Sequence, residues 1–168
     1  MIDAGAAAIW SSLLAAAREL VPLKADALRA GTTPLSDAAR ASLANLAERR
    51  HALEVLTWLE PEVTLALFDD VVRVAAHTQR DALLTRQVLG RLPRKALAER
   101  IDAIVDRLLA AEDDDVYRRL AELARHLGLD ATLARIVERA LASADPDIRD
   151  VGTDFATSDR YSPARPAP

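Results

Sequence analysis

Three aspartates recur at an equal interval, at Asp81, Asp113 and Asp145, and each stands just before a segment with helical spacing of apolar residues. The same shift along the chain superimposes apolar positions. The matching pairs are Ile101 with Leu133, Ile104 with Ile136, Val105 with Val137, and Leu109 with Leu141. Any two amphipathic helices can be matched on apolar residues, so a polar residue that recurs at the same boundary is stronger evidence. We therefore expect an internal repeat of about 32 residues.

The composition favours helices. Of the 168 residues 35 are Ala, the strongest helix former, whereas aromatic residues make up only 4 %. Hydrophobic residues amount to 51 %, which is enough to build a core. The expected fold class is therefore all-α.

The spacing of apolar residues predicts helices over 4–20, 61–77, 80–91, 94–110, 114–127, 129–143 and 146–155. Pro22 is expected to open a separate short helix that reaches Ala30, because Pro is tolerated in a first turn. Thr33 is expected to cap the next helix with Pro34 at its first position, and Gly128 to end a later one. For 35–59 the sequence leaves open whether there is one helix or two.

The repeat resembles a known family. The stretches "LLAAEDDDVYRRLAELARHLG" (108–128) and "ALASADPDIRDVGTDF" (140–155) are similar to HEAT-like repeats, in which a turn of the Asp-Pro-x-Val-Arg kind precedes helix B. Asp145, Pro146, Ile148 and Arg149 match that turn, whereas Tyr117 takes the place of Arg in the preceding unit. The likeness to compact bacterial HEAT-like repeats implies a right-handed α-solenoid of about four antiparallel hairpins, whose B helices line a partner-binding face. It implies no reaction.

This interpretation divides the chain into three parts. Residues 1–32 are expected to form an N-terminal helical cap, 33–156 the HEAT-like repeats, and 157–168 a disordered Pro-rich tail. Three hairpins are expected at 61–92, 93–128 and 129–156, with a fourth, degenerate one at 34–60.

The stretch "AAEDDDVYRR" (110–119) is the most acidic in the chain and raises the question of a metal site. Carboxylates bind Mg²⁺ and Ca²⁺, but four consecutive acidic residues at a helix start diverge around its axis, and the EF-hand spacing is absent. We expect Asp113 or Asp114 to cap the following helix instead, with the neighbouring carboxylates favoured by the helix dipole.

No catalytic pattern stands out. His51, His77 and His126 are scattered, the chain has no Cys, and neither a Gly-x-Ser-x-Gly motif nor a Gly-rich phosphate loop occurs. We expect a protein that is not an enzyme and has no cofactor and no metal. We expect a cytoplasmic protein, which the lack of Cys suits. Asp3 stands where a signal peptide would have basic residues, and no apolar run is long enough for a membrane span.

The expected function is that of a scaffold or adaptor that binds another protein along the helix-B face. The candidate binding residues are Arg86, Gln87, Tyr117, Arg118 and Arg125. The alternative is a nucleic-acid accessory protein that uses an Arg ridge of Arg86, Arg91, Arg94 and Arg118. The net charge of −4 and the interleaved acidic residues make nucleic acid the less favoured partner.

Overall fold

The computed structural model describes residues 4–111 and 113–157, and all regular structure in these ranges is helical. There are ten α-helices and one short 3₁₀ helix, and no strand among the described residues. The first helices are α1 (Ala4–Ala30), α2 (Thr32–Ala44), α3 (Arg49–Leu56), α4 (Pro61–Ala66) and α5 (Phe68–His77). After the 3₁₀ turn Gln79–Asp81 follow α6 (Ala82–Gly90), α7 (Arg94–Leu109), α8 (Asp114–His126), α9 (Asp130–Leu141) and α10 (Pro146–Thr157). The all-α prediction is confirmed.

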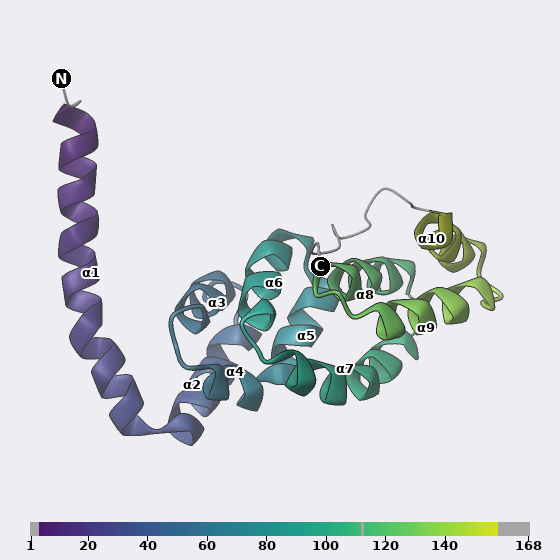
Figure 1. Ribbon diagram of the computed structural model, residues 1–168, viewed down its shortest axis with the longest axis horizontal. Helices are drawn as coiled ribbons and strands as arrows, with labels where there is room; N and C mark the ends of the chain where they lie inside the picture. Colours follow the sequence, from purple (N-terminus) through teal and green to yellow (C-terminus); the bar gives the residue numbers. More distant parts are fainter. Residues whose placement is uncertain (1–3, 112, 158–168) are drawn as a thin grey trace, which may run out of the picture.

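The helices from α2 to α10 form an elongated body. In the view of Figure 1, α3, α6, α8 and α10 follow its upper edge and α2, α4, α7 and α9 its lower edge. Each of α3, α6, α8 and α10 contacts the helix that precedes it along the chain, α2, α5, α7 and α9 respectively. Neighbouring pairs are joined by contacts of α3 with α6, α5 with α7 and α8, and α8 with α9 and α10.

Some buried positions of the body are separated by the interval found in the sequence. Val72, Ile104 and Ile136 occupy equally spaced positions in α5, α7 and α9, and all three are buried. Val88 and Leu120 are separated by the same interval and are buried in α6 and α8. These apolar matches are therefore packing positions. The match of Leu109 with Leu141 is not, because Leu109 is buried whereas Leu141 is 46 % exposed.

Helix α1 stands away from this body. Figure 1 shows it as a long rod that projects from one end and bends partway along its length. Its contacts with the body are mainly with α2, and none of its described residues belongs to the buried core. The helices of the described ranges include none with the length and hydropathy needed to cross a membrane.

Two expected helix boundaries at the start of the chain are wrong. Pro22 does not open a new helix, because α1 continues through it. The helix is exposed at this position, so water can hydrate the carbonyl group that the missing N–H leaves free. Thr33 is not a cap either, since α2 already begins at Thr32, after Gly31 with its positive φ of 84°.

The open question about 35–59 is answered by two helices, α2 and α3. The backbone N–H of Ala47 donates to the side-chain oxygen of Asn45 at 3.0 Å, which forms a turn after α2 in place of a further helical turn. The expected helix over 61–77 is likewise divided, at Leu67, into α4 and α5.

The prediction for Gly128 is confirmed. It follows α8 with a φ of 63°, the left-handed region that Gly adopts at little cost. The N–H of Gly128 donates to the Arg125 carbonyl at 3.1 Å and that of Leu129 to the Ala124 carbonyl at 2.9 Å, the hydrogen bonds of a Schellman motif.

Candidate functional site

The five residues predicted to bind a partner do not form one free surface. Tyr117 is buried, with 2 % of its surface exposed, so the expectation that it lies on the surface of helix B is wrong. Gln87 is exposed on α6. Arg86, Arg118 and Arg125 are partly exposed, and each is held by a group on another helix.

The partners of these arginines lie on the next helix of the upper row. Arg86 of α6 donates to the Glu122 carboxylate of α8 at 2.9 Å, and Arg118 of α8 donates to Asp154 of α10 at 2.9 Å. Arg125 donates to the Phe155 carbonyl at 3.2 Å, with its guanidinium 4.5 Å from the centre of the Phe155 ring. The arginines of helix B thus connect helices within the molecule.

The other two members of the expected Arg ridge are engaged in the same way. Arg91 donates to the carbonyl oxygens of Leu56 and Leu59, both at 2.9 Å, and Arg94 donates to the Gly128 carbonyl. All side-chain hydrogen bonds between distant described residues join positions 26 to 38 apart in sequence. Each such bond therefore spans about one repeat.

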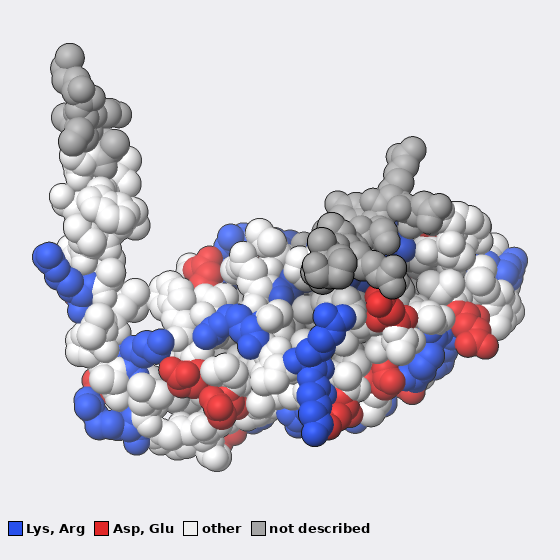
Figure 2. Space-filling model, in the orientation of Figure 1, with Lys and Arg blue, Asp and Glu red and all other residues white. Residues whose placement is uncertain are grey.

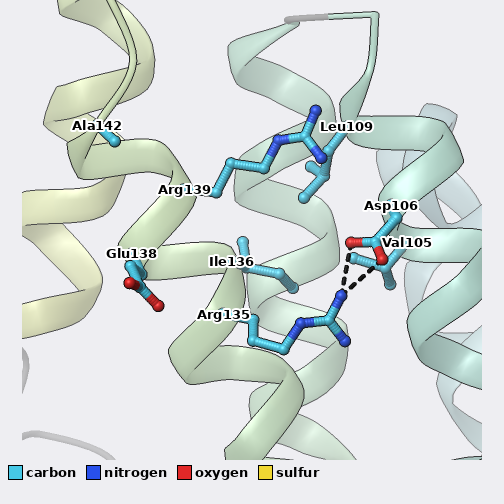
Figure 3. A pocket seen from close by; sticks show the side chains of 8 residues that line it. All are labelled: Val105, Asp106, Leu109, Arg135, Ile136, Glu138, Arg139 and Ala142. Atoms are coloured by element: carbon cyan, nitrogen blue, oxygen red, sulfur yellow. Dashed lines mark hydrogen bonds and ion pairs between the residues drawn. The ribbon is translucent and has the colours of Figure 1, made fainter.

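A cavity of about 350 Å³ lies between α7 and α9 (Figure 3). Arg135 of α9 points across it and contacts Asp106 at 2.6 Å and Asp102 at 2.5 Å, both from α7. Burial lowers the pKa of Arg135, but the hydrogen bond to Asp106 and the charges of Asp102 and Asp106 outweigh this and raise the pKa overall. Arg139 extends toward Leu109 on the other side of the cavity (Figure 3). The Arg135 guanidinium in this cavity is therefore already paired with two carboxylates of α7.

A second polar cavity, of about 410 Å³, lies among α2, α3 and α5. Its Arg40 and Arg73 both contact Asp70, at 3.1 and 3.2 Å, and Arg40 also contacts Asp37 at 2.9 Å. The hydrogen bond with Asp70, followed by that with Asp37, raises the pKa of Arg40. Arg49 also lines the cavity and donates to the Leu43 carbonyl at 2.8 Å and to the Thr78 hydroxyl at 3.3 Å, so each of the three arginines already has a partner within the chain.

The acidic stretch caps α8. The Asp113 carboxylate accepts a hydrogen bond from the Val116 N–H at 3.0 Å, as an N-cap residue does. Asp114 and Asp115 lie in the first turn, and Asp115 contacts Arg119 at 3.0 Å. The cap prediction is confirmed for Asp113. Glu112 lies outside the described residues, and within the described ranges no three His, Asp or Glu side chains gather in a way that could hold a metal ion.

The three aspartates of the series differ in their contacts. Asp145 accepts a hydrogen bond from the Asp147 N–H at 2.9 Å, so it serves the start of α10 much as Asp113 serves α8. Asp81 is buried and makes no such bond to α6, and its Oδ1 has no hydrogen-bond partner among the described residues. The series marks one place in the repeat, but only two of its members act as caps.

Among the described residues, most of the exposed large apolar side chains lie on α1. Eight large apolar side chains of this helix are exposed, for example Trp10 at 62 % and Leu13 at 57 %. The eight are Ile9, Trp10, Leu13, Leu14, Leu20, Val21, Leu23 and Leu28. Their spacing of three or four places them on one half of the helix surface, which we call the α1 apolar face. Leaving such a face in water is unfavourable, which makes it the candidate binding surface.

The α1 apolar face continues into a groove. Residues of the C-terminal half of α1, including Leu20 and Leu23, line a cavity of about 460 Å³ together with Val55 and Trp58 from α3 and the turn that follows it. Lys24 is the one charged residue among the described residues that line it, and its Nζ lies 3.8 Å from a carboxylate oxygen of Glu60. We call this cavity the α1–α3 groove.

Figure 2 shows Lys and Arg side chains interleaved with Asp and Glu over the face of the body in view. His51, His77 and His126 are all exposed and lie on α3, α5 and α8 respectively. Sequence reasoning predicted a helix over 4–20 within an N-terminal cap over 1–32 and did not identify it as a free surface. The available signal for a free surface was the lack of any charged residue between Ala4 and Ala17.

Comparisons with known proteins add no family. No family model matches the chain, and neither a curated protein nor a solved structure matches it significantly. The class that the fold itself defines is an all-α protein with an exposed amphipathic helix at one end.

Proposed function

We propose that the protein is a non-enzymatic interaction module: a HEAT-like α-solenoid body that presents the α1 apolar face and the α1–α3 groove to another polypeptide. The exposure of eight large apolar side chains on one helix carries the proposal. The binding surface is thus proposed to lie on α1 and not on the B helices.

Two observations support a solenoid body. Buried positions such as Val72, Ile104 and Ile136 recur once per repeat, and the distant side-chain hydrogen bonds span about one repeat. In a solenoid each unit contacts only its neighbours, so long-range contacts have a separation close to the repeat length. In the proposed solenoid the four hairpins are α2 with α3, α4 and α5 with α6, α7 with α8, and α9 with α10.

The engaged arginines favour protein over nucleic acid as the partner. Phosphate binding needs guanidinium groups that are free to replace counterions. Arg86 and Arg118 are paired with carboxylates, and Arg91 and Arg94 donate to carbonyl groups.

Site-specific photo-crosslinking in cells that naturally contain the protein tests the proposal. A photoreactive residue in place of Leu13, on the α1 apolar face, is expected to crosslink to a polypeptide. The same residue in place of Ser11, on the opposite side of α1, is the matched control and is expected to give much less product. Equal or absent crosslinking at the two positions would refute the proposal.

A further inference from the structure

We infer that the polypeptide bound to the α1 apolar face is a second copy of this chain, with the two α1 helices antiparallel about a two-fold axis. The N-terminal half of each α1 then lies over the α1–α3 groove of the other copy. This inference rests on the proposed function and names its partner.

The two surfaces that such a dimer needs occur on one chain. A two-fold interface is self-complementary, so each copy must carry both of the surfaces that come into contact. The N-terminal half of α1 offers Ile9, Trp10, Leu13 and Leu14, which are exposed. The C-terminal half offers the groove, an apolar cavity of about 460 Å³.

Both surfaces carry almost no charge. Apart from Lys24, which is paired with Glu60, the described residues that line the groove are apolar. A charged segment in the groove would lose its hydration without gaining a partner, which is costly. The run from Ala4 to Ala17 is the longest stretch of this sequence without a charged residue. The chain therefore carries a segment that fits its own groove.

The available area is what a stable dimer needs. Seven of the eight residues are Ile, Leu or Val, so we take roughly 150 Å² for each side chain, the lower end of the range for aromatic residues. The exposed fractions, 37 to 70 %, then leave on the order of 700 Å² of apolar surface on each α1. A standard interface buries about 800 Å² per partner, whereas the largest apolar patch on an ordinary monomer is about 300–600 Å².

The antiparallel direction follows from the position of the body. An α1 of 27 residues is about 40 Å long, and the body is attached at its C-terminal end (Figure 1). Antiparallel helices place the two bodies at opposite ends of the pair, where they do not collide. Ala17 is the midpoint of α1 (Ala4–Ala30), so the pair crosses at a small residue, with Leu13 beside Val21 of the other copy.

A membrane surface is a poorer occupant. Interfacial helices usually carry many Lys and Arg residues on their polar face. Helix α1 carries only three basic residues, Arg18, Lys24 and Arg29, against Glu19 and Asp26, and its first half has no basic residue at all.

Sedimentation equilibrium of the full chain tests the inference directly. We expect a mass of two chains that dissociates on dilution, because the folded dimer is favoured by mass action. Leu14→Glu should weaken dimerisation about a hundred-fold or more by placing a charge in the apolar contact. The matched control Ser11→Glu, on the polar side of α1, should leave it unchanged. Far-UV circular dichroism establishes that both variants keep the folded body.

Disulfide formation tests the direction of the helices, since the chain has no Cys of its own. Ala17→Cys is expected to give a disulfide-linked dimer, as is a mixture of Leu13→Cys with Val21→Cys. Leu13→Cys alone should not crosslink to itself, and efficient crosslinking by that variant would overturn the antiparallel arrangement.

The outcomes separate the two proposals. A chain that stays monomeric at all concentrations, yet crosslinks through Leu13 to a different polypeptide, overturns the dimer and leaves the interaction module standing. A monomer without crosslinks overturns both. Sedimentation of the chain with anionic phospholipid vesicles, lost in Leu14→Glu but not in Ser11→Glu, would make a lipid surface the occupant and overturn both as well.

Discussion

Arg86 of α6 donates to the Glu122 carboxylate of α8 at 2.9 Å, and the two residues are 36 positions apart in sequence. The contact therefore connects one helical pair with the next. Both side chains are partly shielded, with 25 and 34 % of their surfaces exposed. The arginines that were predicted to bind a partner therefore help to hold neighbouring helices together.

A double-mutant cycle on this pair should give a small, measurable coupling. We expect Arg86→Ala and Glu122→Gln to be coupled by about 0.5–1 kcal/mol in the free energy of unfolding, the upper range for pairs near the surface. Lys95→Ala with Glu99→Gln is the control, because that pair is 3.8 Å apart and largely exposed within α7. Urea unfolding measures both, and equal coupling in the two pairs would contradict the role given to Arg86.

Asp113→Ala should destabilise the body. Its carboxylate accepts from the Val116 N–H, and loss of such an N-cap costs about 1 kcal/mol. Asp114→Ala is the comparison: it removes a charge from the same turn, but Asp114 is not the cap residue. The decisive measurement is the difference in urea midpoint between the two variants. If Asp114→Ala cost as much, the capping bond would not be the cause.

Asp81→Ala should not destabilise the body, in contrast to Asp113→Ala, although both residues belong to the series of equally spaced aspartates. Its Oδ1 is buried without a partner in the described part of the chain, so removal of the carboxyl group relieves a desolvation cost. We expect the free energy of unfolding to stay constant or to rise by up to about 1 kcal/mol. Thermal and urea unfolding will show this, and a loss equal to that of Asp113→Ala would mean that Asp81 stabilises the turn after all.

The features that could be predicted from the sequence depend on nearby residues. The cap at Asp113 and the helix end at Gly128 each rest on hydrogen bonds between residues at most five apart. Several of the equally spaced apolar positions, such as Val72, Ile104 and Ile136, are buried in the structure. Contacts between residues close in sequence can be predicted from the spacing and type of the residues in a short segment.

Tyr117 and α1 depend on distant contacts instead. Helix α8 contacts α5, α7, α9 and α10, so its buried side is wide enough to include Tyr117. The number of neighbours around a helix cannot be read from its own residues. The apolar side of α1 was recognisable, but the periodicity of a helix is the same whether its apolar side packs on the body or on another molecule.

Gly152→Ala should be destabilising because α9 and α10 approach closely at this position. A Cβ there would lie 2.9 Å from the Leu141 backbone nitrogen and 3.1 Å from the Ala140 Cβ. We expect a loss of about 1–3 kcal/mol in the free energy of unfolding, the usual cost of overpacking.

Gly90→Ala is the matched control for that change. Gly90 is also helical, but its nearest neighbour, Leu127 Cδ2, is at 3.9 Å. The substitution should therefore stabilise the chain by about 0.5–1 kcal/mol through helix propensity. Opposite signs of the two effects in urea unfolding are expected, and a stabilising Gly152→Ala would show that α9 and α10 are further apart in solution.

Pro22→Ala should strengthen α1 without changing the stability of the body. Pro22 lies inside an otherwise continuous helix, at an exposed position, so Ala restores a backbone hydrogen bond and removes no packing. Helix formation in α1 should become more favourable by up to about 3 kcal/mol. Far-UV circular dichroism and slower hydrogen exchange over residues 18–26 measure this effect.

Pro61→Ala is the control, since Pro61 lies in the first turn of α4, where Pro is tolerated. If the two variants had equal helicity and exchange, α1 would consist of two separate helices in solution, and the long apolar face proposed for binding would be interrupted at Pro22.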